Sequence, residues 1–248
     1  MKLKKIIVSF LFCAFVSHSY AQLNMGMMNS WVDADLYTRM NIEGKQIDLN
    51  TVKGTPLLYE DFLPGEVKQV KEDKSLTANI RYNVYKDVFE IKTDDNKNEI
   101  GTLDKNNLLS FELRGEEFKY FSGPSVLFEY GNSVNGYLVV VDENEINNKE
   151  ITLLKRYHKK FEPEQKPTSS YGSGSPASFK SGVAYYAKVD DDYFKITPHK
   201  RKAYKDFPEA HQDKVKKYMK KNKIKFRGSE AEQETELKQL MNFLILSQ

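Results

Sequence analysis

The side chains of this chain with the clearest chemical potential are basic. Eight lysine and arginine residues fall within fourteen positions near the carboxyl end: Lys214, Lys216, Lys217, Lys220, Lys221, Lys223, Lys225 and Arg227. Such a density of positive charge is typical of segments that bind nucleic acid or an anionic membrane surface. Within it, Lys216, Lys217, Lys220 and Lys221 are the candidate contacts for an anionic surface.

A second interpretation of these lysines needs no ligand. Residues 200–227 carry 12 basic and three acidic residues. The preceding body at 22–198 carries 22 basic and 28 acidic residues, and the tail from 228 carries one basic and four acidic residues. The lysines can therefore form a solvated helix face that contacts the acidic body or the acidic start of the next helix. We favour this interpretation, and expect that changing the four candidate lysines to glutamine leaves liposome binding unchanged, because screened surface charges interact weakly.

Catalytic and metal-binding patterns are weak by comparison. His158, His199 and His211 have no metal-ligand spacing to one another, and two of them lie among lysines. The single cysteine, Cys13, lies in an N-terminal apolar run behind Phe12, which does not suit a lipid anchor. No Gly-x-Ser-x-Gly pattern is present. We predict no catalytic residue, metal site or cofactor, with a hydrolase acting on envelope or nutrient polymers as the alternative.

The first 21 residues predict export. Three lysines precede an apolar run at 6–16, and small residues occupy positions 19 and 21. The run is shorter than the roughly 20 apolar residues that span a bilayer. We expect a signal peptide cleaved after Ala21, and a mature protein that begins at Gln22 in the periplasm or outside the cell. Export argues against a nucleic-acid partner and favours an envelope or extracellular ligand.

The residue pattern in the body of the chain is typical of an antiparallel sheet. From 44 onward, short runs of Val, Ile, Tyr and Phe are interrupted by turn residues about every eight to twelve positions. Arg114-Gly115-Glu116 predicts a tight hairpin, and the runs at 183–188 and 193–197 are expected to pair. About ten strands follow from this pattern. The predicted fold class is α+β, mainly antiparallel β, with a meander folded into a sandwich or half-barrel and two C-terminal helices.

The segments divide by composition. Residues 22–43 predict an irregular N-terminal arm, and 44–198 the β body. Within the body, a stretch rich in Pro, Ser and Gly at 163–182 predicts a loop, either a lid over a site or a disordered segment. Residues 199–248 hold the basic segment and a helical pair.

The two helices have recognisable signals. Apolar residues recur at helical spacing over 208–222, and Pro208 suits a first turn. Ser229 and Glu232 form a capping box for the second helix. Its apolar stripe consists of Leu237, Leu240, Met241, Leu244 and Ile245. We expect this pair to dock on the sheet.

Several short blocks of the sequence resemble blocks that recur in a known group of proteins. They are Gly54-Thr55-Pro56-Leu57-Leu58, Phe62, Gly65-Glu66-Val67, the run at 80–90 and the closing run at 220–224. With these blocks the chain resembles a family of uncharacterised secreted proteins common in Bacteroidota. The resemblance implies export and a β-rich body. No activity is assigned to that family, so it implies no catalytic residues.

Taken together, these features favour an exported, non-catalytic envelope or surface protein with a binding or structural role. Besides the hydrolase, one further alternative stays open, a carrier that holds an apolar ligand inside a curved sheet.

Overall fold

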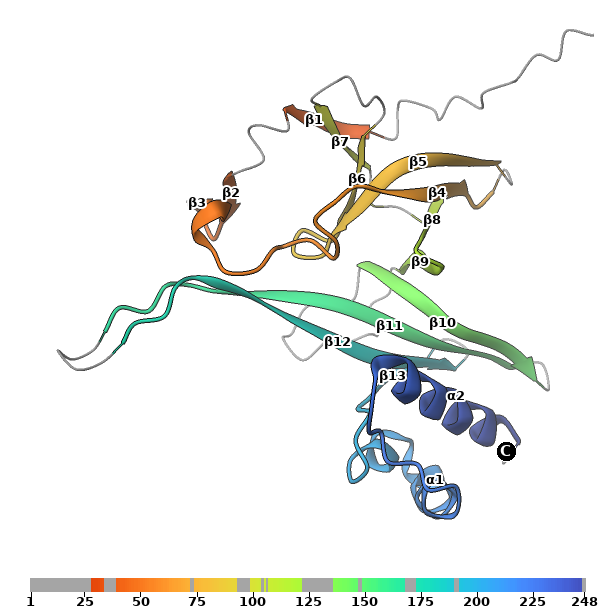
Figure 1. Cartoon of the computed structure of the whole chain (residues 1–248). Helices are drawn as coiled ribbons and strands as arrows, with labels where there is room; N and C mark the ends of the chain where they lie inside the picture. Colours follow the sequence, from red (N-terminus) through yellow and green to blue (C-terminus); the bar gives the residue numbers. More distant parts are fainter. Residues whose placement is uncertain are drawn as a thin grey trace, which may run out of the picture.

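A computed structural model shows that the chain is built around one large antiparallel sheet (Figure 1). It describes residues 28–33, 39–71, 74–92, 99–103, 105, 107–121, 136–146, 149–167, 173–189 and 192–246. The predicted signal peptide lies outside these described residues and stays a prediction.

Eleven strands form the sheet, in the order β1-β7-β6-β5-β4-β8-β9-β10-β11-β12-β13. Their bounds are β1 (Met28–Asp33), β4 (Leu63–Gln69), β5 (Lys74–Asn83), β6 (Val88–Lys92), β7 (Glu99–Leu103), β8 (Leu109–Leu113), β9 (Glu116–Phe121), β10 (Gly136–Ile146), β11 (Lys149–Glu162), β12 (Ser178–Val189) and β13 (Asp192–Ile196). A separate hairpin joins β2 (Arg39–Ile42) to β3 (Lys45–Asp48). The remaining elements are two short 3-10 helices, η3 (Leu49–Thr51) and η4 (Ala203–Asp206), and two α-helices, α1 (Glu209–Lys221) and α2 (Glu230–Leu246).

Aromatic side chains on one face of the sheet show that it curls. Phe89 of β6 stacks on Phe111 of β8 with ring centroids 3.9 Å apart. Tyr137 of β10 meets Phe89 edge-on at 5.1 Å, although β6 and β10 lie five places apart in the strand order. The sheet therefore forms a half-barrel whose interior is filled by rings, and β1 and β13 remain as open edges. The predicted fold class is confirmed.

Asp87, in the turn between β5 and β6, stabilises the curvature of the sheet. Its φ of 56° lies in the left-handed region, and its side chain is buried. Asp87 Oδ1 accepts hydrogen bonds from the hydroxyl of Tyr82 at 2.5 Å and from the amide of Tyr137 at 3.1 Å. Oδ2 lies 3.4 Å from Lys105 Nζ and 4.0 Å from Arg156 Nη2. One carboxylate thus joins the β5–β6 turn to the start of β10 and to the middle of β11.

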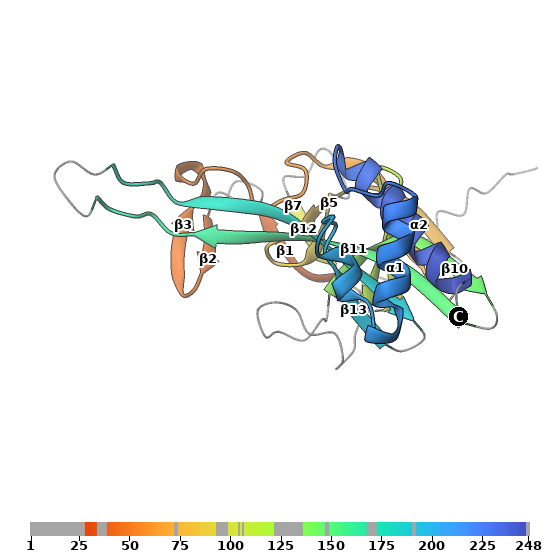
Figure 2. The same ribbon diagram turned by 90° about the horizontal axis from the view of Figure 1, so that it is seen from below.

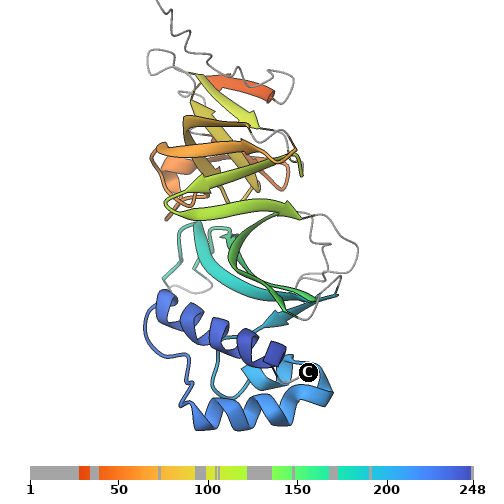
Figure 3. The ribbon, with the colours of Figure 1, turned by 90° about the vertical axis from the view of Figure 1, so that its right-hand side faces the viewer.

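The two helices cover one end of the sheet, as expected. Figure 2, seen from below, shows α1 and α2, in blue, over the β11–β13 end, and Figure 3 shows them at the opposite end of the molecule from β1. Leu237, Leu240 and Leu244 of the predicted stripe are buried in a cluster with residues of β11, β12 and β13. Val215 and Met219 anchor α1 in the same cluster.

Two predictions that depend only on residues close together in the sequence, the hairpin turn at 114–116 and the capping box of the second helix, are confirmed. Arg114 and Gly115, with φ of 53° and 79°, make the tight turn between β8 and β9. The side chain of Glu232 accepts a hydrogen bond from the amide of Ser229 at 2.7 Å, while the amide of Glu232 donates to Ser229 Oγ at 3.3 Å. This is the reciprocal arrangement that the capping box predicts.

Two segment predictions are wrong in part. The arm expected to be irregular at 22–43 contains β1 and β2. The loop expected at 163–182 is too long, because β12 begins at Ser178, and Gln165 and Ser175 exchange two backbone hydrogen bonds of 2.9 Å. Low apolar content indicates that a segment buries little, yet strand pairing needs only backbone groups, which Ser and Gly also provide. Residues 168–172 lie outside the described part of the chain.

A buried lysine joins α2 to the sheet. Lys155 of β11 is 3 % exposed, and its ammonium group contacts the carboxylate of Glu116 at the start of β9. On the other side it lies 3.1 Å from Glu230 and 2.9 Å from Glu234, both in the first turns of α2. An unpaired ammonium group would be costly at such a buried position, so the three carboxylates fix where α2 docks.

Replacement of Lys155 should weaken the docking of α2 on the sheet. We expect Lys155→Met to lower the free energy of unfolding by about 3 kcal/mol, because it leaves carboxylates without their cation. The matched control is Lys119→Met, since Lys119 is 37 % exposed and lies 3.5 Å from Glu117. That change should cost less than about 1 kcal/mol. Urea unfolding measures both, and equal losses would contradict the assigned role of Lys155.

The same group of residues predicts a decline of stability in alkali. Burial alone would lower the pKa of Lys155, but hydrogen bonds to Glu116 and Glu234 outweigh it, so the pKa is raised. Burial raises the pKa of Tyr157 and of Tyr185. All three groups therefore hold their protons more tightly in the folded chain than in the unfolded chain.

Their stabilising contribution is complete below the unfolded pKa values, at about pH 10, and is lost as the pH rises above them. Each group can lower the free energy of unfolding by up to about 1.4 kcal/mol per pH unit. Urea titrations between about pH 8 and pH 11 should show this decline, with a shallower slope in Lys155→Met. A flat profile in the unaltered protein would rule it out.

Candidate anion-binding site

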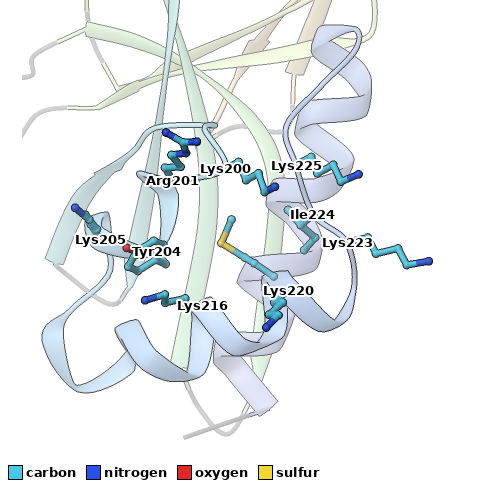
Figure 4. A pocket seen from close by; sticks show the side chains of 10 residues that line it. Lys200, Arg201, Tyr204, Lys205, Lys216, Lys220, Lys223, Ile224 and Lys225 are labelled. Carbon is cyan, nitrogen blue, oxygen red and sulfur yellow. The ribbon is translucent and has the colours of Figure 1, made fainter.

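A pocket with basic walls lies between η4, α1 and the chain that leaves α1. Its volume is about 530 Å³. We call it the basic pocket, and its lining consists of Lys200, Arg201, Tyr204, Lys205, Lys216, Met219, Lys220, Lys223, Ile224 and Lys225. Seven of these ten residues are cations. Figure 4 shows that they come from different segments around the pocket, and that Arg201, Lys205, Lys223 and Lys225 point away from its centre.

The seven cations of the pocket are all exposed to solvent. Within the part of the chain that the structure describes, none of them forms an ion pair with a carboxylate. The ammonium group of Lys216 instead lies over the ring of Tyr204, 5.1 Å from its centroid. This contact holds one lysine against the pocket wall and leaves its charge available.

The end of α1 supplies the apolar floor. The amide of Ile224 donates to the carbonyl of Met219 at 3.0 Å, and the amide of Lys223 donates to the carbonyl of Lys220 at 3.4 Å. This pair of bonds is the Schellman motif, in which the residues here filled by Met219 and Ile224 make an apolar contact. Both are almost fully buried, at 4 % and 3 % exposure. The helix terminus therefore sets the depth of the pocket.

Lys223 occupies a strained backbone position on the rim. Its φ is 58°, in the left-handed region where helices ordinarily place glycine. A side chain there costs roughly 1–2 kcal/mol relative to right-handed backbone. Non-glycine residues held in such conformations cluster at functional sites. Here the chain places a cation on the rim where glycine would be easier to accommodate.

The acidic residues at the start of α2, expected from the sequence to contact the basic segment, make their described contacts elsewhere or with its backbone. Glu230 and Glu234 contact Lys155, and Glu232 caps its own helix. Glu236 accepts hydrogen bonds from the backbone amides of 225 and 226. The described contacts of these four carboxylates are therefore with Lys155, with backbone amides or with Ser229, and not with a lysine side chain of α1.

The four candidate lysines divide into two pairs. Lys216 and Lys220 line the basic pocket. Lys217 and Lys221 are also exposed, but they lie about 100° further round the helix and do not line it. Sequence reasoning missed the contribution of Lys200, Arg201, Tyr204 and Lys205. Their charge was visible in the composition of 200–227, whereas their position opposite α1 depends on the turn through η4.

The three histidines stay apart. His158 is on β11, His199 precedes η4 and His211 is on α1. Among the described residues, no group of three His, Cys, Asp or Glu side chains could hold a metal ion. The helices that the structure describes include none long and apolar enough to cross a membrane.

Comparisons with protein-family models, with curated proteins and with solved structures found no match. The geometry of the basic pocket therefore carries the functional argument.

The strain at Lys223 can be tested directly. Lys223→Gly should raise the free energy of unfolding by about 1 kcal/mol, because glycine adopts positive φ without steric cost. The control is Lys221→Gly, the same change within α1, which should lower stability by about 1 kcal/mol. Urea unfolding of both variants checks the prediction, and a loss of stability in Lys223→Gly would refute it.

Proposed function

We propose that this protein is an exported, non-catalytic binding protein of the cell envelope or surface, and that its basic pocket binds an anionic ligand. The observation that carries the proposal is the gathering of seven cations, none in an ion pair among the described residues, around one pocket. Export rests on the sequence pattern of residues 1–21.

Electrostatics supports an anionic ligand. Like charges gathered around one opening repel each other, and soluble surfaces ordinarily intersperse both signs. An anion placed between these lysines would remove that repulsion and gain attraction from several of them at once. Lysine ammonium groups are mobile point charges, which suit a phosphate without requiring one fixed orientation.

The chemistry of the lining supports binding rather than catalysis. The ten residues of the basic pocket are lysine, arginine, tyrosine, methionine and isoleucine. They provide charge and apolar contact, and no described member of the lining is a histidine, serine or carboxylate. The curved sheet gives less support to a carrier role, since Tyr82, Phe89, Phe111, Phe118 and Tyr137 fill its interior.

Liposome binding tests the proposal with two matched variants. The protein purified after export should bind phosphatidylglycerol vesicles and not phosphatidylcholine vesicles, and added salt should weaken the binding. Because each lysine contributes about 1 kcal/mol near an anionic surface, changing both Lys216 and Lys220 to glutamine should weaken binding roughly thirtyfold. This replaces the unchanged liposome binding that we expected from the sequence.

The control removes the same charge from the same helix outside the pocket. Changing both Lys217 and Lys221 to glutamine should weaken binding less than about threefold, because only their long-range attraction to the anion is lost and salt screens it. Equal losses in the two double variants would place the interaction on the helix surface rather than in the pocket. No affinity for phosphatidylglycerol vesicles at low salt would defeat the proposal.

A further inference from the structure

We infer that the basic pocket binds a single acidic lipid of a bilayer, with the phosphate-bearing head among the lysines and the first part of an alkyl chain inside the pocket. The inference rests on the proposed function and adds to it the chemical class of the ligand. It follows from how polar and apolar groups are distributed in the pocket.

The walls of the pocket are apolar for a structural reason. A lysine carries its charge at the end of a four-carbon stem, and the stem packs along apolar surface while the ammonium group reaches water. Lys200, Lys216 and Lys220 line the pocket in this way (Figure 4). Below them lie Met219 and Ile224. The depth of the pocket is therefore hydrocarbon, and its mouth is positively charged.

A small inorganic anion fits this arrangement poorly. Helix sites that enclose phosphate use amino-terminal amides, which point at the anion. Here the pocket lies at the carboxyl end of α1, where carbonyl groups present partial negative charge. An anion is thus favoured at the rim, beside the ammonium groups, and not on the floor.

A hydrophilic polyanion also uses only part of the site. Its charges would contact the lysine tips and leave the apolar walls in water. An acidic lipid satisfies both regions, since its head pairs with the rim and its chain removes the lysine stems from water above the already buried Met219 and Ile224. The volume of about 530 Å³ lies within the range of small-molecule sites, roughly 300–1,000 Å³.

A series of monomeric alkyl phosphates separates the head from the chain. Inorganic phosphate, hexyl phosphate and octyl phosphate share one anionic group and differ in hydrocarbon. The exported protein would be labelled with ¹³C at the methionine methyl groups and titrated with each compound. Met219 reports on the pocket, and Met241, buried on α2 and outside the lining, is the internal control. Met219→Leu assigns the resonance without removing its volume.

We expect octyl phosphate to shift the Met219 resonance saturably and to leave Met241 in place. Each methylene that enters the pocket should raise affinity roughly fourfold, so octyl phosphate should bind more than tenfold better than hexyl phosphate. Changing both Lys216 and Lys220 to glutamine should weaken both compounds by a similar factor and preserve the increment per methylene.

Equal affinity for inorganic and octyl phosphate, or an unmoved Met219 resonance, would overturn the inference. If phosphatidylglycerol vesicles still bound through Lys216 and Lys220 in that case, the proposed function would stand and only the lipid assignment would fall. If octyl phosphate bound with the expected increment and vesicles did not, the ligand would be a free amphiphile, which overturns the bilayer as its source.

Discussion

The architecture depends on one buried charge. Lys155 lies buried on β11, near the β13 end of the sheet, where an ammonium group without partners would be strongly unfavourable. It obtains those partners from two distant parts of the chain, Glu116 at the start of β9 and the pair Glu230 and Glu234 in α2. Apolar contacts hold α2 against the sheet, and this charge decides the position at which it docks.

The chemistry of the basic pocket is a consequence of that pairing. The acidic residues at the start of α2 follow the basic segment directly in the sequence. Glu230 and Glu234 contact Lys155, and Glu232 and Glu236 accept hydrogen bonds from backbone amides. The lining of the basic pocket therefore contains cations and no carboxylate, which favours attraction of an anion.

The helix terminus links stability to the proposed binding. The end of α1 places Met219 and Ile224 together as the floor of the pocket, and the same motif requires left-handed backbone at Lys223. Glycine would relieve the strain and remove a cation from the rim. For the proposed binding, lysine at this position exchanges stability for charge on the rim, as binding sites commonly do.

The sequence by itself determined the features that neighbouring residues control. The capping box of Ser229 and Glu232, the turn at Arg114 and the apolar stripe of α2 each depend on residues within about one helical turn or one hairpin, so pattern and propensity suffice. The mainly antiparallel class followed in the same way from alternating runs and turns.

Only the tertiary structure decided which charges meet. Lys155 and Glu230 are 75 residues apart, and nothing in their local sequence distinguishes a buried ion pair from two solvated groups. For the same reason, Lys216 and Lys217 are equivalent as letters, yet one lines the pocket and the other does not. A charge count sums over position, whereas attraction and desolvation depend on distance and burial, which exist only after the sheet has curled and the helices have docked.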